Sequence, residues 1–222
     1  MRTLAIAAAF LFTQLASVQG ARASEATPSG LSVGVGLDMF YDGTVTDRSG
    51  NSVHDRSGLL DLGVLANFGD FAVGGGLGWA PGIFGDGRLL VGARAGWQPT
   101  IGTTRVHLLW EIGVHRYTHV EEGLFSVSTP DFFSTTYVGA QIGITRELVK
   151  DGGFEYGVAL FLRQDMDQQP FVHQEESFLG GTNPPPTDLI VGGTMIGASV
   201  TLGFRVDRAS IEFMKRPHEF GR

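Results

Sequence analysis

Large apolar residues alternate with small or polar residues along most of the chain. Between residues 31 and 41 the odd positions carry Leu, Val, Val, Leu, Met and Tyr, whereas the even positions carry Ser, Gly, Gly, Asp and Phe. A period of two places successive side chains on opposite faces of a β-strand. The same alternation predicts eight strands, over residues 31–41, 60–68, 71–79, 88–98, 105–116, 132–145, 153–163 and 195–206.

The lengths of the strands and of their connections indicate a barrel that crosses a membrane. Most predicted strands have about 9–14 residues, whereas strands of globular proteins have about 5–6 and membrane-spanning strands about 9–11. The connections 69–70, 99–104 and 146–152 are short, and 42–58, 80–87, 117–131 and 164–194 are longer. Short periplasmic turns and long extracellular loops are typical of outer-membrane barrels.

The composition of the second face decides which face points outward. A soluble barrel or sandwich, the alternative, turns its apolar face inward and its polar face to water. Here the second face is rich in glycine with scattered charges, and exposed glycine weakens a strand. An eight-stranded barrel has room inside for side chains and little more. We therefore predict that the aliphatic face meets lipid and that the glycines and charges line the lumen.

Aromatic residues lie near the ends of several predicted strands. Aromatic girdles at the two membrane interfaces are a feature of outer-membrane barrels. Trp110 falls in the middle of a strand and does not fit a girdle. The residues that fit the pattern are Tyr41, Phe68, Trp79, Trp97 and Phe154.

The first residues have the layout of a secretory signal peptide. A positive start at Arg2 precedes an apolar run over residues 4–16, and the small-x-small sequence 21–23 follows. We predict cleavage after Ala23, with cleavage after Gly20 as the alternative. Removing 23 residues from 222 leaves 199, which is the length of one ordinary domain. The removed segment carries two arginines and no acid, so the net charge changes from −7 to −9.

An acidic, exported chain without cysteine excludes several classes of function. Negative net charge makes a poor partner for nucleic acid. The absence of cysteine excludes disulfides, thiolate metal sites and a cysteine nucleophile. We predict no cofactor.

With this leader, strand pattern and loop asymmetry, the chain resembles the small outer-membrane barrel proteins of the OmpA/OmpX type. The resemblance implies an all-β, eight-stranded antiparallel up-and-down transmembrane β-barrel over residues 31–206, preceded by a periplasmic segment over 24–30. It also implies a cell outer-membrane location, contact with outer-membrane lipid and lipopolysaccharide, and a monomer. Such barrels often end on an aromatic residue. Here the chain continues over 207–222, which we expect to be a periplasmic tail or an extension of the last strand.

Charges of both signs fall on the predicted lumen face. Folding the hairpin about the 99–104 turn brings Arg94 near Glu111, and a similar count brings Glu155 near Arg205. Charges in a narrow lumen need partners, so we predict a lumen plugged by paired charges. A narrow channel for ions or small solutes is the alternative. The predicted network comprises Asp61, Arg88, Arg94, Glu111, Glu155, Arg163 and Arg205.

Three glycines of the segment 71–79 fall on the same predicted lumen face. They are Gly74, Gly76 and Gly78, and the stretch looks at first like a phosphate-binding loop. Such a loop needs a helix after it, whereas here another strand follows. We expect the missing side chains to leave space for Asp61, Arg88 and Arg94 instead.

The histidines of the predicted strands are candidates for catalysis. Some small outer-membrane barrels act on lipid A through a histidine, so a lipid A-modifying hydrolase is a further alternative. His107 and His115 share one face with Glu111, but four residues of strand span about 13 Å, too far for one site. No catalytic or metal-binding residue is predicted.

The long loops are acidic, which favours a structural or surface-interaction role. The acids could form a solvated rim at the cell surface, or they could bind divalent cations near lipopolysaccharide. Alternatively, the loops could present Phe125, Phe171 and Phe178 to a partner.

Overall fold

The computed structural model describes residues 29–47, 49–51, 57–80, 87–118, 132–148, 153–173, 187–207 and 211. The predicted signal peptide and almost all of the predicted tail lie outside these residues, as do most acids of the predicted loops. Across the described ranges no helix is long and apolar enough to span a membrane.

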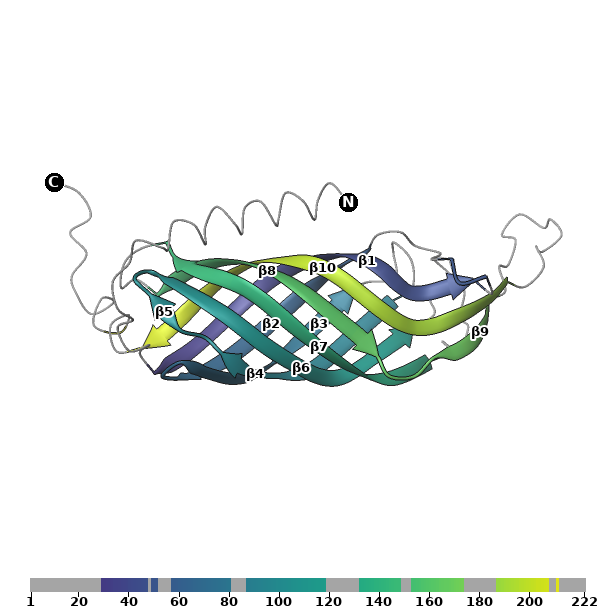
Figure 1. Ribbon diagram of the computed structural model, residues 1–222, viewed down its shortest axis with the longest axis horizontal. Coiled ribbons are helices and arrows are strands. Elements are labelled where there is room, and N and C mark those ends of the chain that lie inside the picture. Colours follow the sequence, from purple (N-terminus) through teal and green to yellow (C-terminus); the bar gives the residue numbers. More distant parts are fainter. Residues whose placement is uncertain are drawn as a thin grey trace, which may run out of the picture.

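Eight long antiparallel strands form a closed barrel. Each strand pairs with the next long strand along the chain, and the first pairs with the last, which leaves no open sheet edge along the wall (Figure 1). The prediction of an all-β, eight-stranded antiparallel barrel is confirmed. The long strands are β1 (Gly30–Asp47), β2 (Ser57–Phe68), β3 (Phe71–Ala80), β4 (Gly87–Trp97), β6 (Thr104–Thr118), β7 (Phe132–Glu147), β8 (Phe154–Asp165) and β10 (Thr187–Asp207).

Two short strands were not predicted. β5 (Thr100–Ile101) pairs with β6, and β9 (Gln169–His173) pairs with the first residues of β10. The prediction of a loop over 164–194 is therefore wrong in part, because β10 begins at Thr187. Backbone pairing on both sides, with β9 and with the end of β1, holds this segment as a strand although its sequence does not alternate.

The two ends of the barrel differ. Gly30 pairs with Asp207 at one end, which we call the terminal end. The opposite end, which we call the distal end, carries β9 and the extended parts of β1 and β10 (Figure 1). At the terminal end Gly69 has a φ of 60°, a left-handed conformation that favours glycine in the tight turn between β2 and β3.

The aliphatic face points outward, as the composition of the other face predicts. Val35, Ile112 and Leu202 are 57 %, 57 % and 64 % exposed, whereas the charged residues of the same strands are buried. The predicted girdle residues Tyr41, Phe68, Trp79, Trp97 and Phe154 are all about half exposed or more. Trp110 also faces outward, in the middle of β6.

Candidate functional site: a layered lumen

Among the described residues, we distinguish four successive layers of side chains inside the barrel, and β1 runs past all four. Four inward-facing residues of β1 mark these layers from the terminal to the distal end. Ser32 contacts the first layer, and the second, third and fourth layers contain Asp38, Phe40 and Asp42. The strand alternation explains this order, because every second residue of β1 enters the lumen.

The first layer, nearest the terminal end, is a charge cluster of five residues. Arg105 pairs with Glu155 and donates a hydrogen bond to Ser32 Oγ at 3.2 Å. Arg205 pairs with Glu147, lies 3.6 Å from Glu155 Oε1, and contacts Asp207 at 2.6 Å. We call Arg105, Glu147, Glu155, Arg205 and Asp207 the terminal charge cluster; it holds two guanidinium groups and three carboxylates.

The second layer is a continuous chain of ion pairs that crosses the lumen. Arg94 binds Asp61 through two hydrogen bonds of 2.6 and 2.9 Å, and its Nε lies 2.8 Å from Glu111 Oε1. Arg163 binds the other oxygen of Glu111 at 2.7 Å and Asp38 at 2.8 Å. We call these five residues the central charge cluster. Its members come from β1, β2, β4, β6 and β8, so the chain of pairs ties distant strands together.

The third layer is apolar. Its six residues pack against one another and are 0–4 % exposed. The Arg163 guanidinium lies 4.3 Å from the ring centre of Phe161, where the central charge cluster meets this layer. We call the set the apolar layer; it comprises Phe40, Leu59, Leu90, Tyr137, Phe161 and Met195.

The fourth layer, the distal polar cluster, comprises Asp42, Arg88, His115, Tyr117 and Asp165. Arg88 lies 2.5 Å from Asp42 Oδ2. Asp165 accepts a hydrogen bond from the Tyr117 hydroxyl at 2.5 Å and lies 3.0 Å from His115 Nδ1. The His115 and Tyr117 rings are 4.0 Å apart at their centres. His115 is 0 % exposed.

The structure divides the charges that the sequence assigns to one network. It brings Asp61, Arg94, Glu111 and Arg163 together in the central charge cluster, and Glu155 and Arg205 in the terminal charge cluster. Arg88 is separate, because the apolar layer lies between it and the central charge cluster. Buried charge pairs do lie in the lumen, and the apolar layer lies there in addition, which the sequence analysis did not predict.

Several lumen residues were missed by the sequence analysis. Arg105, Asp42 and Asp165 form buried ion pairs or charged hydrogen bonds, and none of them was assigned to the network. The alternation of β6 puts Arg105 on the same face as His107 and Glu111, so its inward orientation was available from the pattern. Asp42 and Asp165 sit at positions that were predicted to be loops.

The three glycines of β3 have different roles. A Cβ atom at Gly76 would lie 2.6 Å from Arg94 Cζ, so this glycine does leave space for a charged side chain. At Gly78 a Cβ would instead meet Leu59 Cδ1 at 2.9 Å, and at Gly74 it would meet the backbone oxygen of Val64 at 1.9 Å. The expectation that all three make room for charges is therefore wrong, since Gly74 permits close strand approach and Gly78 admits an apolar side chain.

The described histidines of β6 are lumen residues. His107 and His115 are 6 % and 0 % exposed and belong to different levels of the lumen. Within the described ranges there is no group of three or more His, Cys, Asp or Glu side chains placed to hold a metal ion. The described lumen side chains bury and pair charges.

Comparison with solved structures finds small outer-membrane barrels. The N-terminal β-barrel domain of Pseudomonas aeruginosa OprF superposes with a TM-score of 0.52 at 8 % identity, covering 81 % of this chain and all of that chain. Neisserial surface protein A gives a TM-score of 0.47 at 9 % identity, covering 78 % of this chain and 96 % of that chain. The attachment invasion locus protein Ail of Yersinia pestis, in complex with the heparin analogue sucrose octasulfate, gives 0.43 at 14 % identity, with coverage of 79 % and 99 %.

The likeness to the OprF barrel domain shows the fold alone. No protein-family model matches the sequence. No curated protein is recognisably related to it either.

Proposed function

We propose that the chain is an exported outer-membrane barrel with a sealed lumen, which serves a structural or surface-interaction role as a monomer. Its outward aliphatic belt contacts the lipid, and its distal end carries the segments that meet lipopolysaccharide and extracellular partners. The fold shared with the OprF barrel domain supports the membrane location.

The single observation that carries the proposal is the filling of the lumen. The apolar layer and the central charge cluster lie one above the other, and nearly every side chain in them is less than 10 % exposed. An ion that crossed the barrel would leave water at the apolar layer, at a cost of several kcal/mol or more. A belt of exposed Leu, Val, Ile and Trp on the outside needs lipid to cover it.

The two alternative functions have less support. A narrow channel needs a continuous polar path, whereas the apolar layer interrupts the polar lumen between Asp38 and Asp42 of β1. A lipid A-modifying hydrolase needs a base that its substrate reaches. His107 and His115 are buried in the lumen, away from a lipid substrate. In the described part of the chain the His115 Nε2 atom also makes no hydrogen bond, so no hydroxyl nucleophile is paired with it there.

The location is tested by fractionation and gel mobility. The mature chain should remain with the outer membrane after removal of soluble proteins. It should also migrate faster before boiling than after, because a folded barrel resists detergent denaturation. Recovery in the soluble periplasmic fraction, with equal mobility before and after boiling, would contradict the proposal.

A further inference from the structure

Arg146 is a cation on the outer face of the barrel, near the terminal end. Its neighbours along β7, Thr145 and Glu147, face the lumen, so the strand alternation turns Arg146 outward, where it is exposed. Arg105 and Arg205, at the same end, pair with carboxylates inside the barrel instead. Arg146 therefore presents a positive charge to whatever surrounds the wall.

The position of Arg146 along β7 matches the edge of a membrane. The outward residues between Thr136 and Arg146 are all apolar; they are Val138, Ala140, Ile142 and Ile144. Thr136 and Arg146 are 146 − 136 = 10 positions apart, which corresponds to about 33 Å of strand. A strand tilted by about 40° then spans about 25 Å along the barrel axis, which is the height of the apolar band of outer-membrane barrels. Arg146 therefore lies at the level of the lipid headgroups.

Apolar side chains lie beside Arg146 on the outer face. Leu148 follows it on the same face of β7, and the Leu148 backbone N–H donates a hydrogen bond to the Phe154 carbonyl of β8 at 2.8 Å. Leu148 and Phe154 are 59 % and 57 % exposed, and the Phe154 ring lies 5.0 Å from the Phe204 ring at their centres. The aliphatic stem of an arginine can lie along such a surface while its guanidinium reaches the headgroups.

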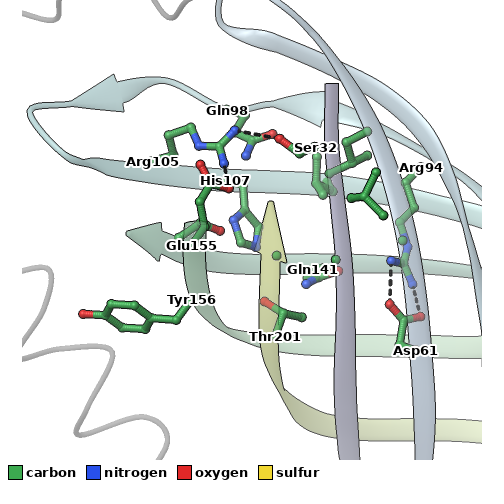
Figure 2. Close-up of a pocket in the computed structure, with 17 residues that line it drawn as sticks. Ser32, Asp61, Arg94, Gln98, Arg105, His107, Gln141, Glu155, Tyr156 and Thr201 are labelled. Carbon is green, nitrogen blue, oxygen red and sulfur yellow. Dashed lines mark hydrogen bonds and ion pairs between the residues drawn. The ribbon is translucent and has the colours of Figure 1, made fainter. Parts of the chain in front are cut away.

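A second hydrogen-bond donor stands opposite Arg146. The register pairs Arg146 with Tyr156 of β8, and opposite residues of antiparallel strands have Cβ atoms about 4.5–5.5 Å apart. Figure 2 shows the Tyr156 ring pointing away from His107 and Glu155, which face the lumen. One oxyanion between the two side chains can therefore accept hydrogen bonds from both a guanidinium and a phenolic hydroxyl.

The nearest acids along β7 and β8 point into the lumen. Glu147 binds Arg205 there, and Glu155 binds Arg105. In the described part of the chain, no hydrogen bond or ion pair engages the Arg146 guanidinium. The outer face is therefore positive at this point.

We propose that Arg146 and Tyr156 form a binding site for the phosphate group of an anionic phospholipid. The proposal rests on the proposed membrane location. The guanidinium offers paired donors to the phosphate oxygens, and the acyl chains of the same lipid cover the apolar residues beside it. Short connections face the periplasm in outer-membrane barrels, so the lipid belongs to the periplasmic leaflet. Exposed charge pairs are weak, so the site selects among lipids rather than holds the barrel together.

The sequence has no cysteine, so the substitution Leu148→Cys allows one fluorophore to be attached beside the site. The full chain is refolded in phosphatidylcholine vesicles that contain a small fraction of lipid spin-labelled near the headgroup. Quenching of the fluorophore is compared between spin-labelled phosphatidylglycerol and spin-labelled phosphatidylcholine. Phe71→Cys is the reference position, because Phe71 is 66 % exposed at the same end of the barrel, on β3, and β4 and β6 lie between β3 and β7.

At Leu148→Cys the association constant derived from quenching should be about threefold higher for phosphatidylglycerol than for phosphatidylcholine. At Phe71→Cys the two lipids should quench equally. In the Leu148→Cys background, Arg146→Gln should bring the ratio to about one, Tyr156→Phe should lower it, and Arg146→Lys should retain part of it. Inorganic phosphate in the buffer should leave the ratio unchanged, because the acyl chains keep the lipid at the site.

Equal quenching by the two lipids at Leu148→Cys, or the same preference at both positions, would overturn the proposal. So would a preference that survives Arg146→Gln or disappears in inorganic phosphate. None of these results would contradict the proposed membrane location, provided that phosphatidylcholine quenches at both positions. If neither lipid quenched at either position, the membrane location and the lipid site would both fail.

Discussion

Removing Arg163 should strongly destabilise the barrel, because this guanidinium holds two buried carboxylates of the central charge cluster. The side chain is about 3 % exposed and binds Glu111 at 2.7 Å and Asp38 at 2.8 Å. The substitution Arg163→Met keeps much of the apolar volume but leaves Asp38 buried without its cation, while Glu111 retains Arg94. Breaking a buried pair on one side costs about 3–5 kcal/mol.

The free energy of unfolding is measured by urea titration of the refolded chain in lipid vesicles, followed by tryptophan fluorescence. The double variant Arg163→Met/Asp38→Asn removes the stranded charge as well. It should recover part of the loss, with a coupling energy of about 0.5–3 kcal/mol between the two sites. Arg146→Met is the matched control, since this arginine is exposed near the end of β7, and its loss should change stability by less than about 0.5 kcal/mol.

An Arg163→Met variant that loses no more stability than Arg146→Met would contradict this prediction. So would a double variant whose loss of stability equals the sum of the losses of Arg163→Met and Asp38→Asn measured separately. Either result would mean that the lumen charges are hydrated and weakly coupled.

Two further predictions concern the lumen glycines and the outer belt. Gly76→Ala brings a Cβ within 2.6 Å of Arg94 Cζ, and this overpacking should lower the free energy of unfolding by about 1–3 kcal/mol. In the control Gly34→Ala the nearest atom lies at 3.6 Å, so the urea midpoint should change little. Equal effects of the two substitutions would contradict the packing argument. Ile112 lies on the outward face in the middle of β6, so Ile112→Arg should destabilise the vesicle-inserted protein by about 2–4 kcal/mol. Thr136→Arg, nearer the distal end, should cost about 0–1 kcal/mol. An Ile112→Arg variant with unchanged stability would mean that water covers this face.

The strands could be predicted because their signal is local. An alternating pattern can be recognised from neighbouring residues alone. Counting across the short connection between β4 and β6 placed Glu111 near Arg94. The observed register places these two residues directly opposite each other. Glu155 and Arg205 lie near each other because β8 and β10 are neighbours in the wall, although the connection between these strands is long.

Contacts across the lumen could not be read from the sequence. Arg163 contacts Asp38, which is 125 positions away in the sequence. This contact depends on the closure of the barrel and on the tilt of its strands, and a local sequence pattern predicts neither of these features. The apolar layer was missed for a similar reason. Phe40 and Leu90 look like exceptions on a polar face when each strand is considered alone, and they form a layer only when the strands are assembled. A bulge between Gly43 and Val45 also changes which residues of β1 face inward, so Val45 is fully buried.

The claim of a sealed lumen is tested most directly by electrical conductance across a planar lipid bilayer. The refolded chain, shown to be folded by its mobility before boiling, is incorporated and held at a range of voltages. The layered lumen predicts a silent membrane with no steady single-channel openings. Steady, ohmic openings that scale with salt concentration would contradict it, because ions would then have a continuous aqueous path past the apolar layer.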